Sequence, residues 1–234
     1  MKVCFYGDSI GRGVVFDNAK QRYGYSDQSF ARLLADHGLL ELNNRCKFGC
    51  TSGKGLTIMQ AEAEQMSQYD YIVIMYGGND SDYDWPAVAA DPTGPDRVKT
   101  PIPQFEQNIR EMVELVRRSG GTPVLLSMVP IDPEKYFRWI TRTADANGVL
   151  EFLGSWFRIY RGNEMYNLAL FRMAGELEVP IIDICSPFLR GRDFGDLLCE
   201  DGIHPSEKGH RLIYDAVCEY LTAHHVLQQG EKKE

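Results

Sequence analysis

Two polar segments of the chain carry the residue types that acyl-transfer chemistry requires. Gly7–Ser9 ends in a serine hydroxyl, and Asp201–Pro205 contains an acid three residues before a histidine. A serine hydroxyl is a weak nucleophile at neutral pH and needs an adjacent base, usually an imidazole that a carboxylate orients. Of the five histidines, only His204 has such an acid before it in a predicted loop. We therefore expect Ser9, Asp201 and His204 to form a catalytic triad.

Two further segments could stabilise the negative charge that develops on a carbonyl oxygen during acyl transfer. Gly77–Asp80 contains Asn79, whose side chain offers an NH₂ donor. Thr51–Gly53 contains Gly53, whose backbone N–H a substrate can approach closely because glycine has no Cβ. The backbone amide of Ser9 could be a third donor, so these groups are candidates for an oxyanion hole.

Each of these segments also has a structural explanation. A Gly-Asp-Ser turn after a strand is common, and Asn79 and Asp80 could cap a turn that leads into a helix. Gly53 could be a turn glycine, and His204 could lie on the surface at the start of a helix. The catalytic interpretation depends on the four segments meeting at one edge of one sheet.

The elements that would position these segments alternate between strands and helices. Apolar runs predict strands over residues 3–6, 71–76, 122–129 and 179–184, and a weaker signal predicts one over 46–51. Helical spacing predicts helices over 29–37, 56–68, 105–118, 165–177 and 207–224, the last with Ser206 as its N-cap. This alternation predicts a parallel sheet covered on both faces, a doubly wound α/β domain. In such sheets ligands bind beyond the carboxyl ends of the strands, which is where the polar segments fall.

The four segments resemble the sequence blocks of GDSL esterases, which belong to the SGNH hydrolase superfamily. Gly7–Ile10 resembles the Gly-Asp-Ser-Leu block, with Ile10 in place of leucine. Gly49–Gly53, Gly77–Asp80 and Asp201–Pro205 resemble three further blocks in the family's order, and the resemblance spans residues 3 to about 221.

The resemblance implies a three-layer α/β/α, flavodoxin-like fold with a sheet of about five parallel strands. It also implies Ser9 as nucleophile, His204 as base and Asp201 as its orienter, with Gly53 and Asn79 as oxyanion donors. Lys47 stands where the second block often has asparagine, which bears on the choice of Gly53 over Gly49.

Composition and motifs argue against several other classes of function. Lys and Arg number 25 against 33 for Asp and Glu, a net charge of −8, which disfavours nucleic acid and anionic membranes as partners. No glycine motif in the sequence fits a dinucleotide-binding loop. The histidines lack metal-liganding spacing except for the adjacent pair 224–225. We therefore expect neither a metal nor a cofactor.

The length favours one domain over residues 1–225, with insertions at 81–103 and 131–163 and a frayed tail at 226–234. No apolar stretch approaches the ~18 residues of a membrane span. The sequence shows no signal peptide, and its six scattered cysteines are expected to be reduced thiols. Both observations predict a cytoplasmic protein. It does not indicate the oligomeric state.

The insertions are the predicted source of substrate specificity. Trp85 lies in the first, and Trp139 and Trp156 lie in the aromatic-rich second, where they could line a pocket or pack a small core of their own. The sequence favours an esterase for short-chain, most of all acetyl, esters of a carbohydrate or small molecule. The alternatives are a lysophospholipase or thioesterase for longer acyl chains, and a non-catalytic acyl- or glycan-binding domain on the same fold.

Overall fold

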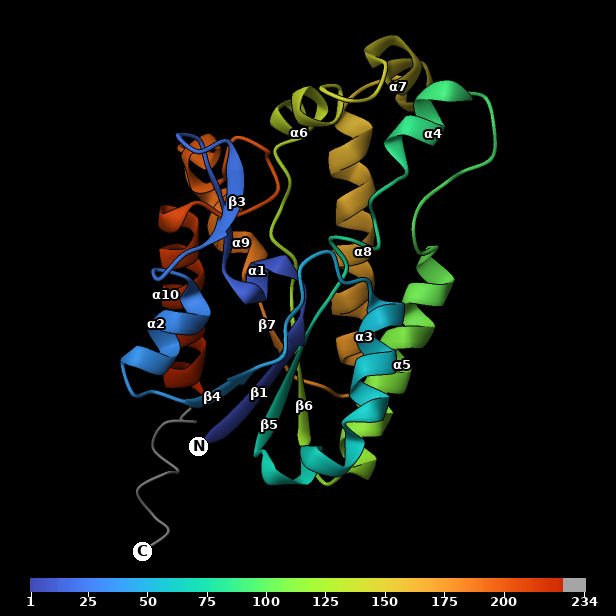
Figure 1. Ribbon diagram of the computed structural model, residues 1–234. Helices are drawn as coiled ribbons and strands as arrows, with labels where there is room; N and C mark the ends of the chain where they lie inside the picture. Colours follow the sequence, from blue (N-terminus) through green and yellow to red (C-terminus); the bar gives the residue numbers. More distant parts are fainter. Residues whose placement is uncertain (225–234) are drawn as a thin grey trace, which may run out of the picture.

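A parallel sheet of five strands forms the centre of the protein in the computed structural model, which describes residues 1–224 (Figure 1). Its strand order is β4-β1-β5-β6-β7. The strands are β1 (Lys2–Gly7), β4 (Glu41–Asn44), β5 (Tyr71–Met75), β6 (Thr122–Leu126) and β7 (Ile181–Ile182). The chain adds β4 on one side of β1 and then crosses to β5 on the other side, so the order reverses at β1.

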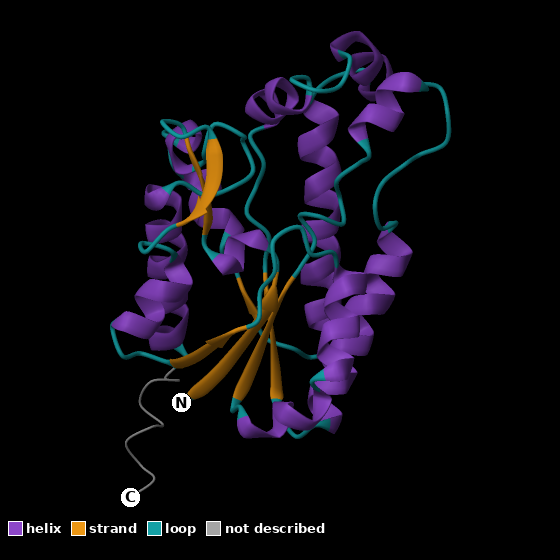
Figure 2. Cartoon of the chain, viewed as in Figure 1, coloured by secondary structure: helices purple, strands orange, loops and turns teal. Residues whose placement is uncertain are grey.

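Helices cover both faces of this sheet, which gives the three layers that the sequence predicts (Figure 2). One face carries α3 (Ser52–Ala61), α5 (Ile102–Arg118) and α8 (Phe157–Glu176). The other face carries α2 (Phe30–Asp36), α9 (Cys185–Arg190) and α10 (Glu207–Ala223). None of the helices within residues 1–224 is long and apolar enough to cross a membrane.

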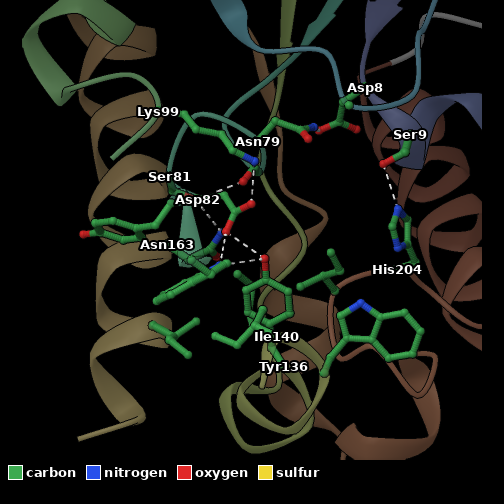
Figure 3. A pocket seen from close by; sticks show the side chains of 18 of the residues that line it. Asp8, Ser9, Asn79, Ser81, Asp82, Lys99, Tyr136, Ile140, Asn163 and His204 are labelled. Carbon is green, nitrogen blue, oxygen red and sulfur yellow. Dashed lines mark hydrogen bonds and ion pairs between the residues drawn. The ribbon is translucent and has the colours of Figure 1, made fainter. Parts of the chain in front are cut away.

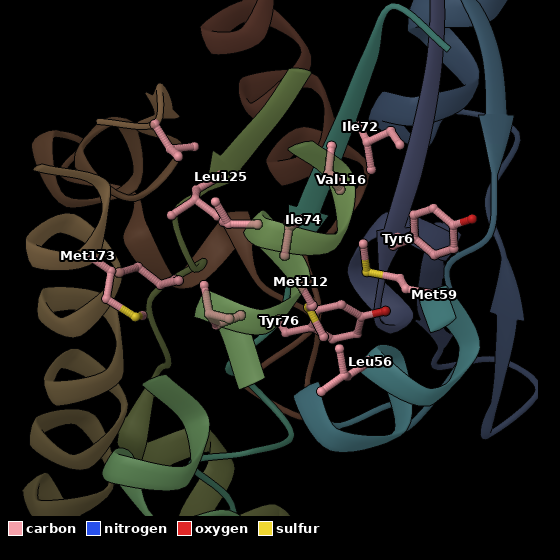
Figure 4. Packing of buried hydrophobic residues seen from close by; sticks show 14 of the residues in the cluster. Tyr6, Leu56, Met59, Ile72, Ile74, Tyr76, Met112, Val116, Leu125 and Met173 are labelled. Atoms are coloured by element: carbon pink, nitrogen blue, oxygen red, sulfur yellow. The ribbon is translucent and has the colours of Figure 1, made fainter. Parts of the chain in front are cut away.

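Alternate residues of each strand enter the two hydrophobic layers. In β1, Cys4 and Tyr6 pack under α3 and α5, whereas Val3 and Phe5 pack under α2 and α10. Figure 4 shows the first layer, in which Tyr6 lies against Met59 of α3. Because both faces are buried, the strands read as unbroken apolar runs rather than as alternating ones.

Two predicted elements differ from the structure on the β4 side of the sheet. The strand predicted over 46–51 is wrong, because Gly49 adopts a φ of +66° there and the strand lies earlier, at Glu41–Asn44. This strand is at the sheet edge and half-exposed, so it lacks an apolar run. The helix predicted over 56–68 is instead α3, which begins at Ser52, followed by a 3₁₀ turn over Ala63–Gln68.

The sequence reading also missed an antiparallel hairpin near the end of β1. It comprises β2 (Val14–Asp17) and β3 (Arg22–Tyr25), and it follows the four-residue helix α1 (Ser9–Arg12). Its strands are only four residues each, shorter than the windows in which alternation is recognised.

The two long insertions pack on each other at one end of the molecule, above the sheet in Figure 1. The first contains α4 (Trp85–Ala90), and the second contains α6 (Pro133–Ile140), α7 (Ala146–Leu153) and the start of α8. Their buried side chains form what we call the cap cluster: Trp85, Val88, Ile131, Tyr136, Ile140, Ala144, Val149, Leu153 and Ile159. The insertions thus form one shared wall beyond the carboxyl ends of the strands.

We expect Gly148→Ala to loosen this cap. A Cβ on Gly148 of α7 would lie 2.3 Å from the Ala89 carbonyl oxygen of α4, so the two helices would have to separate. Overpacking of this kind costs about 1–3 kcal/mol, and urea denaturation would measure it as a lower free energy of unfolding. Gly162→Ala is the matched control, because Gly162 of α8 has open space around its Cβ position. Equal stability of the two variants would contradict the close helix contact.

Candidate active site

The residues predicted as a triad lie in one hydrogen-bonded line at the carboxyl edge of the sheet. The Nε2 atom of His204 is 2.9 Å from the Ser9 hydroxyl oxygen, the contact drawn in Figure 3. The Nδ1 atom of the same ring is 2.6 Å from an Asp201 carboxylate oxygen. Exposed fractions are 7% for Ser9, 4% for His204 and 0% for Asp201. This is the arrangement in which an imidazole can take a proton from a serine hydroxyl.

Close packing against the sheet fixes the position of Ser9. Asp8 is the N-cap of α1 and accepts a hydrogen bond from the Ile10 amide, at 3.0 Å. A Cβ on Gly7 would lie 2.8 Å from the Met75 carbonyl oxygen, and one on Gly11 would also collide with its neighbours. The glycines on both sides of Ser9 therefore let α1 lie directly on β5.

Hydrogen bonds to the Asp201 carboxylate stabilise the conformation of the Asp201–His204 loop. One Asp201 oxygen accepts the amides of Ile203 and His204, both at 3.1 Å, while the other accepts from the imidazole. Burial raises the pKa of the Asp201 carboxyl, but the hydrogen bonds and charge of His204 outweigh it, so the pKa lies below its usual value. Asp201 therefore remains an anion although it is buried.

The second insertion packs against this loop and hydrogen-bonds to it. Gly202 has a φ of +75°, and a Cβ there would lie 2.7 Å from both the Asp132 carbonyl oxygen and the Tyr136 nitrogen of α6. The Asp132 amide donates to the Gly202 carbonyl at 2.9 Å, and the Lys135 ammonium donates to the Leu198 carbonyl at 3.2 Å. The start of α6 therefore positions the loop that carries Asp201 and His204.

Asn79 lines the same cavity as Ser9, and Asp8 lies between the two in Figure 3. Its side-chain nitrogen lies 3.5 Å from an Asp8 carboxylate oxygen. The next residue, Asp80, is fully buried and accepts both the amide and the hydroxyl of Ser52. Asp80 thus joins the end of β5 to the start of α3 and fixes the turn that presents Asn79.

The structure does not bring Gly53 to the cavity. The cavity of about 800 Å³ in front of Ser9 is lined by Gly49, Asn79 and His204 among others, but not by Gly53. Gly53 lies within α3, where a Cβ would point toward Asn108 of α5. Gly49, at a φ of +66°, is the glycine of the second block that faces the cavity.

The three tryptophans predicted near the pocket have different positions. Trp85 and Trp139 line the cavity. Trp156 does not line it and instead stacks on Phe157, with ring centroids 4.4 Å apart. One face of Trp139 is covered by the Arg142 guanidinium at 4.0 Å, which leaves it less suited as a platform for a sugar ring.

The far end of the cavity contains a polar network that the sequence reading missed (Figure 3). One carboxylate oxygen of Asp82 accepts from the Trp85 indole at 2.8 Å and the Tyr136 hydroxyl at 2.7 Å. Its other oxygen pairs with the Lys99 ammonium at 2.7 Å. The network joins the two insertions across the cavity, and no sequence pattern relates residues 54 positions apart such as Asp82 and Tyr136.

Two aromatic residues beside the imidazole were also missed. Tyr23 of the hairpin and Phe48 of the loop after β4 both line the cavity and lie within 6.0 Å of the His204 ring, centroid to centroid. The signal that could have found Tyr23 is the pairing of Val14–Asp17 with Arg22–Tyr25 as a hairpin.

The serine–imidazole–carboxylate line lies at the switch point of a three-layer α/β/α fold. Residues 5–212 match the GDSL-like Lipase/Acylhydrolase family, and the chain belongs to that family.

Two relatives of the chain are named as esterases. The chain is 28% identical over 174 residues to the isoamyl acetate-hydrolyzing esterase of Saccharomyces cerevisiae, covering 74% of this chain and 65% of the relative. It therefore spans slightly less than two thirds of that yeast protein. It is 22% identical over 216 residues to the GDSL esterase/lipase WDL1 of Oryza sativa subsp. japonica, covering 89% of this chain and 76% of the relative.

Solved structures share the fold at lower identity. LAE5, an alpha/beta hydrolase enzyme from the metagenome of Lake Arreo, has a TM-score of 0.66 and 21% identity, with 97% of this chain and 95% of that chain covered. The psychrotrophic esterase EstA of Pseudoalteromonas sp. has a TM-score of 0.62 and 16% identity, with 95% and 97% covered.

We expect Asp8→Asn to make the protein more stable at neutral pH. Burial raises the pKa of the Asp8 carboxyl from 3.8 to about 6, so its protonated form stabilises the fold below that range and this contribution disappears as the pH rises through 6. The asparagine keeps an oxygen to cap α1 but carries no charge. The gain should be roughly 2–3 kcal/mol at pH 7 and vanish near pH 4, measured by urea denaturation.

Asp27→Asn, at an exposed position, is the control for this substitution. It removes one surface carboxylate and should change the free energy of unfolding at pH 7 far less than Asp8→Asn does. A pH-independent effect of Asp8→Asn would contradict the raised pKa.

Proposed function

We propose that the protein hydrolyses short-chain carboxylic esters, most of all acetyl esters of a small molecule or carbohydrate, with Ser9, His204 and Asp201 as its triad. The observation that carries this proposal is the pair of hydrogen bonds at 2.9 Å and 2.6 Å that links the three side chains. The Ser9 end of this line opens into the cavity of about 800 Å³.

The reaction begins when the Ser9 oxygen attacks the ester carbonyl carbon. Nε2 of His204 takes the hydroxyl proton as the new C–O bond forms, and Asp201 stabilises the resulting imidazolium through Nδ1. The imidazolium then gives this proton to the leaving alcohol as the ester C–O bond breaks. Water attacks the acyl-serine in the second half, with the same imidazole taking its proton and returning it to the Ser9 oxygen.

The negative charge on the carbonyl oxygen needs donors aimed into the cavity. We propose the Asn79 side-chain NH₂ and the backbone amides of Ser9 and Gly49 for this role. Gly49 replaces Gly53 in this assignment, because Gly49 lines the cavity beside Ser9 and Gly53 does not. The Asp8 carboxylate, 3.5 Å from the Asn79 nitrogen, orients the NH₂ group.

The preference for small esters rests on the cavity and on one relative. Apolar side chains of the cap cluster, among them Ile131, Ile140 and Ile159, form part of the wall and suit an uncharged acyl or alkyl group. The yeast relative is named for the hydrolysis of isoamyl acetate, an acetyl ester of a small alcohol. We also infer that residues 1–225 form one domain, with the insertions at 81–103 and 131–163 as its cap. The tail at 226–234 lies outside the described residues.

The size of the cavity supports the second candidate, hydrolysis of longer acyl chains by a lysophospholipase or thioesterase activity. About 800 Å³ is more space than an acetyl group with a small alcohol fills. A third alternative, acyl or glycan binding without catalysis, has no observation in its favour, since the three triad residues are in hydrogen-bond contact. A cytoplasmic address stays a prediction of the sequence.

We expect Ser9→Ala to abolish hydrolysis of p-nitrophenyl acetate, and a fluorophosphonate probe to label the natural protein at Ser9 only. Asn79→Ala should keep the label but lower kcat by ~10²–10³, because a donor to the oxyanion is lost. Steady-state kinetics and mass spectrometry of the labelled peptide measure both. Full activity of Ser9→Ala would show that another residue is the nucleophile.

A series of p-nitrophenyl esters from two to twelve carbons, run beside acetylated sugars, separates the candidate substrates. We expect kcat/KM to be highest for chains of two to four carbons. A maximum at eight carbons or more would favour the lysophospholipase or thioesterase alternative. Binding without turnover of any ester would favour the non-catalytic one.

A further inference from the structure

We infer that the far end of the cavity binds a hydroxyl group on the alcohol part of the ester, with Asn163 as the acceptor and Lys99 as a donor. The inference rests on the proposed function, because a short acyl group at Ser9 leaves the far end to the alcohol. It makes Asn163 a specificity-determining residue. It also narrows the substrates to esters of hydroxylated alcohols, such as a diol, a polyol or a sugar.

Asn163 of α8 has a buried side chain that lines the cavity, and its amide has a defined orientation. The residue is 2% exposed, and its NH₂ group donates to the Ser81 hydroxyl oxygen at 3.4 Å. The Ser81 hydroxyl gives its own proton to the Gly78 carbonyl, at 3.2 Å, so it can only accept from Asn163. The NH₂ group of Asn163 therefore faces Ser81, and the carbonyl oxygen Oδ1 is the free end of the amide.

The Oδ1 atom of Asn163 is an acceptor that lacks a donor. It is buried, and none of the groups in residues 1–224 donates a hydrogen bond to it. A buried acceptor without a hydrogen bond is unfavourable, and such atoms are rare in folded proteins. Within the same residues, Asn163 alone both has a side-chain atom of this kind and lines the cavity. We therefore assign the missing donor to the ligand.

The ion pair of Asp82 and Lys99 lies at the same end of the cavity. Figure 3 shows both residues with Ser81 and Asn163, apart from Ser9, and all of them line the cavity. The Lys99 ammonium donates to one Asp82 oxygen at 2.7 Å, its one hydrogen bond to a side chain or backbone group of residues 1–224. Its side chain is 41% exposed, so two of its three N–H groups are available to a ligand.

Backbone pairing fixes the Asp82 and Lys99 side chains relative to each other. The Lys99 amide donates to the Asp82 carbonyl at 2.8 Å, and the adjacent residues Tyr83 and Val98 form an antiparallel bridge. The two ends of the first insertion are thus paired in the protein without a ligand. Since the donor is already positioned, binding requires little ordering of the chain.

A hydroxyl group fits these contacts better than the other groups that the alcohol could carry. It donates its proton to Oδ1 of Asn163, and its oxygen, or that of a neighbouring hydroxyl, accepts from Lys99. A methyl group would leave Oδ1 without a donor. A carboxylate has no proton to donate at neutral pH, and it would be repelled by Asp82 and Asp84, which both line the cavity.

The test compares acetate esters in which a terminal hydroxyl replaces a terminal methyl. The pairs are hydroxyethyl with propyl acetate, hydroxybutyl with pentyl acetate, and hydroxyhexyl with heptyl acetate, so the series samples the reach into the cavity. We expect the natural protein to favour the hydroxylated ester of at least one pair about 10- to 100-fold in kcat/KM, because a site that pairs a hydroxyl rejects the analogue that lacks it. Both esters are measured with the same protein, so any loss of active protein cancels in their ratio.

Two variants test the residues that carry the inference. Asn163→Leu keeps the branched shape but removes the acceptor, and we expect the ratio for the best pair to fall to about 1 or below. Lys99→Met removes the ammonium and should lower the ratio about 3- to 10-fold. The matched control is Lys208→Met, because Lys208 pairs with Asp196 at 3.2 Å but does not line the cavity. It should leave the ratio unchanged.

The inference is overturned if no pair shows a preference for the hydroxyl, or if Asn163→Leu keeps the natural ratio. A fall in the ratio for Lys208→Met as large as that for Lys99→Met would also contradict it, because the effect would then not come from the cavity.

NMR of the Ser9→Ala protein gives a readout that needs no turnover. The side-chain amide signals of Asn163 should shift when the hydroxylated ester of the best pair is added and stay in place with its alkyl partner. If the natural protein hydrolyses no ester but this shift is seen, the proposed function fails and the hydroxyl site stands. If esters are hydrolysed without a hydroxyl preference and the signals do not move, the inference about Asn163 alone fails.

Discussion

A carboxylate with no exposed surface is the constraint around which this site is built. Asp201 is 0% exposed, and an anion taken out of water is stable only if donors surround it. Its two oxygens receive the imidazole and two backbone amides, and this requires the tight turn in which Gly202 adopts a positive φ. This turn packs closely against the start of α6, where a Cβ on Gly202 would collide with the backbone. Satisfying one buried charge therefore fixes a loop, a helix and the ring that faces Ser9.

The sheet supplies the other half of the geometry. Because the strand order reverses at β1, the loops after β1 and β5 open toward the same space, which both Ser9 and Asn79 line. The buried Asp80 plays the same part here as Asp201 does across the cavity, since it binds the start of α3 to the end of β5. Two buried acids thus brace the walls of one cavity, and neither contacts the substrate in the mechanism proposed.

Features that depend on local sequence patterns could be predicted, whereas features that depend on tertiary contacts could not. The strands of the sheet interior were predictable because both their faces are buried. Ser9 and His204 could be singled out as candidates because they lie in short segments with distinctive composition, and their side chains are in hydrogen-bond contact. The edge strand Glu41–Asn44 was not predictable, because half of it faces water. The proposed assignment of Gly49 rather than Gly53 as an oxyanion donor depends on which glycine faces the cavity. The sequence does not show this, because it depends on where the loop ends and α3 begins. The contacts of Tyr23 and Asp82 depend on tertiary packing alone.

The double use of α6 has a consequence for anyone who would redesign the substrate range. One side of this helix, through Tyr136 and Ile140, borders the cavity, while its first turn supports the Asp201–His204 loop. Under the proposed function, mutations that reshape the pocket from α6 would therefore disturb turnover and selectivity together. The helices α4 and α7 touch each other but make no such contact with the loop among those described for residues 1–224. Of these two helices α4 alone lines the cavity, through Trp85 and Pro86, so under the proposed function substitutions in α4 would alter the choice of ester and leave the Asp201–His204 loop in place.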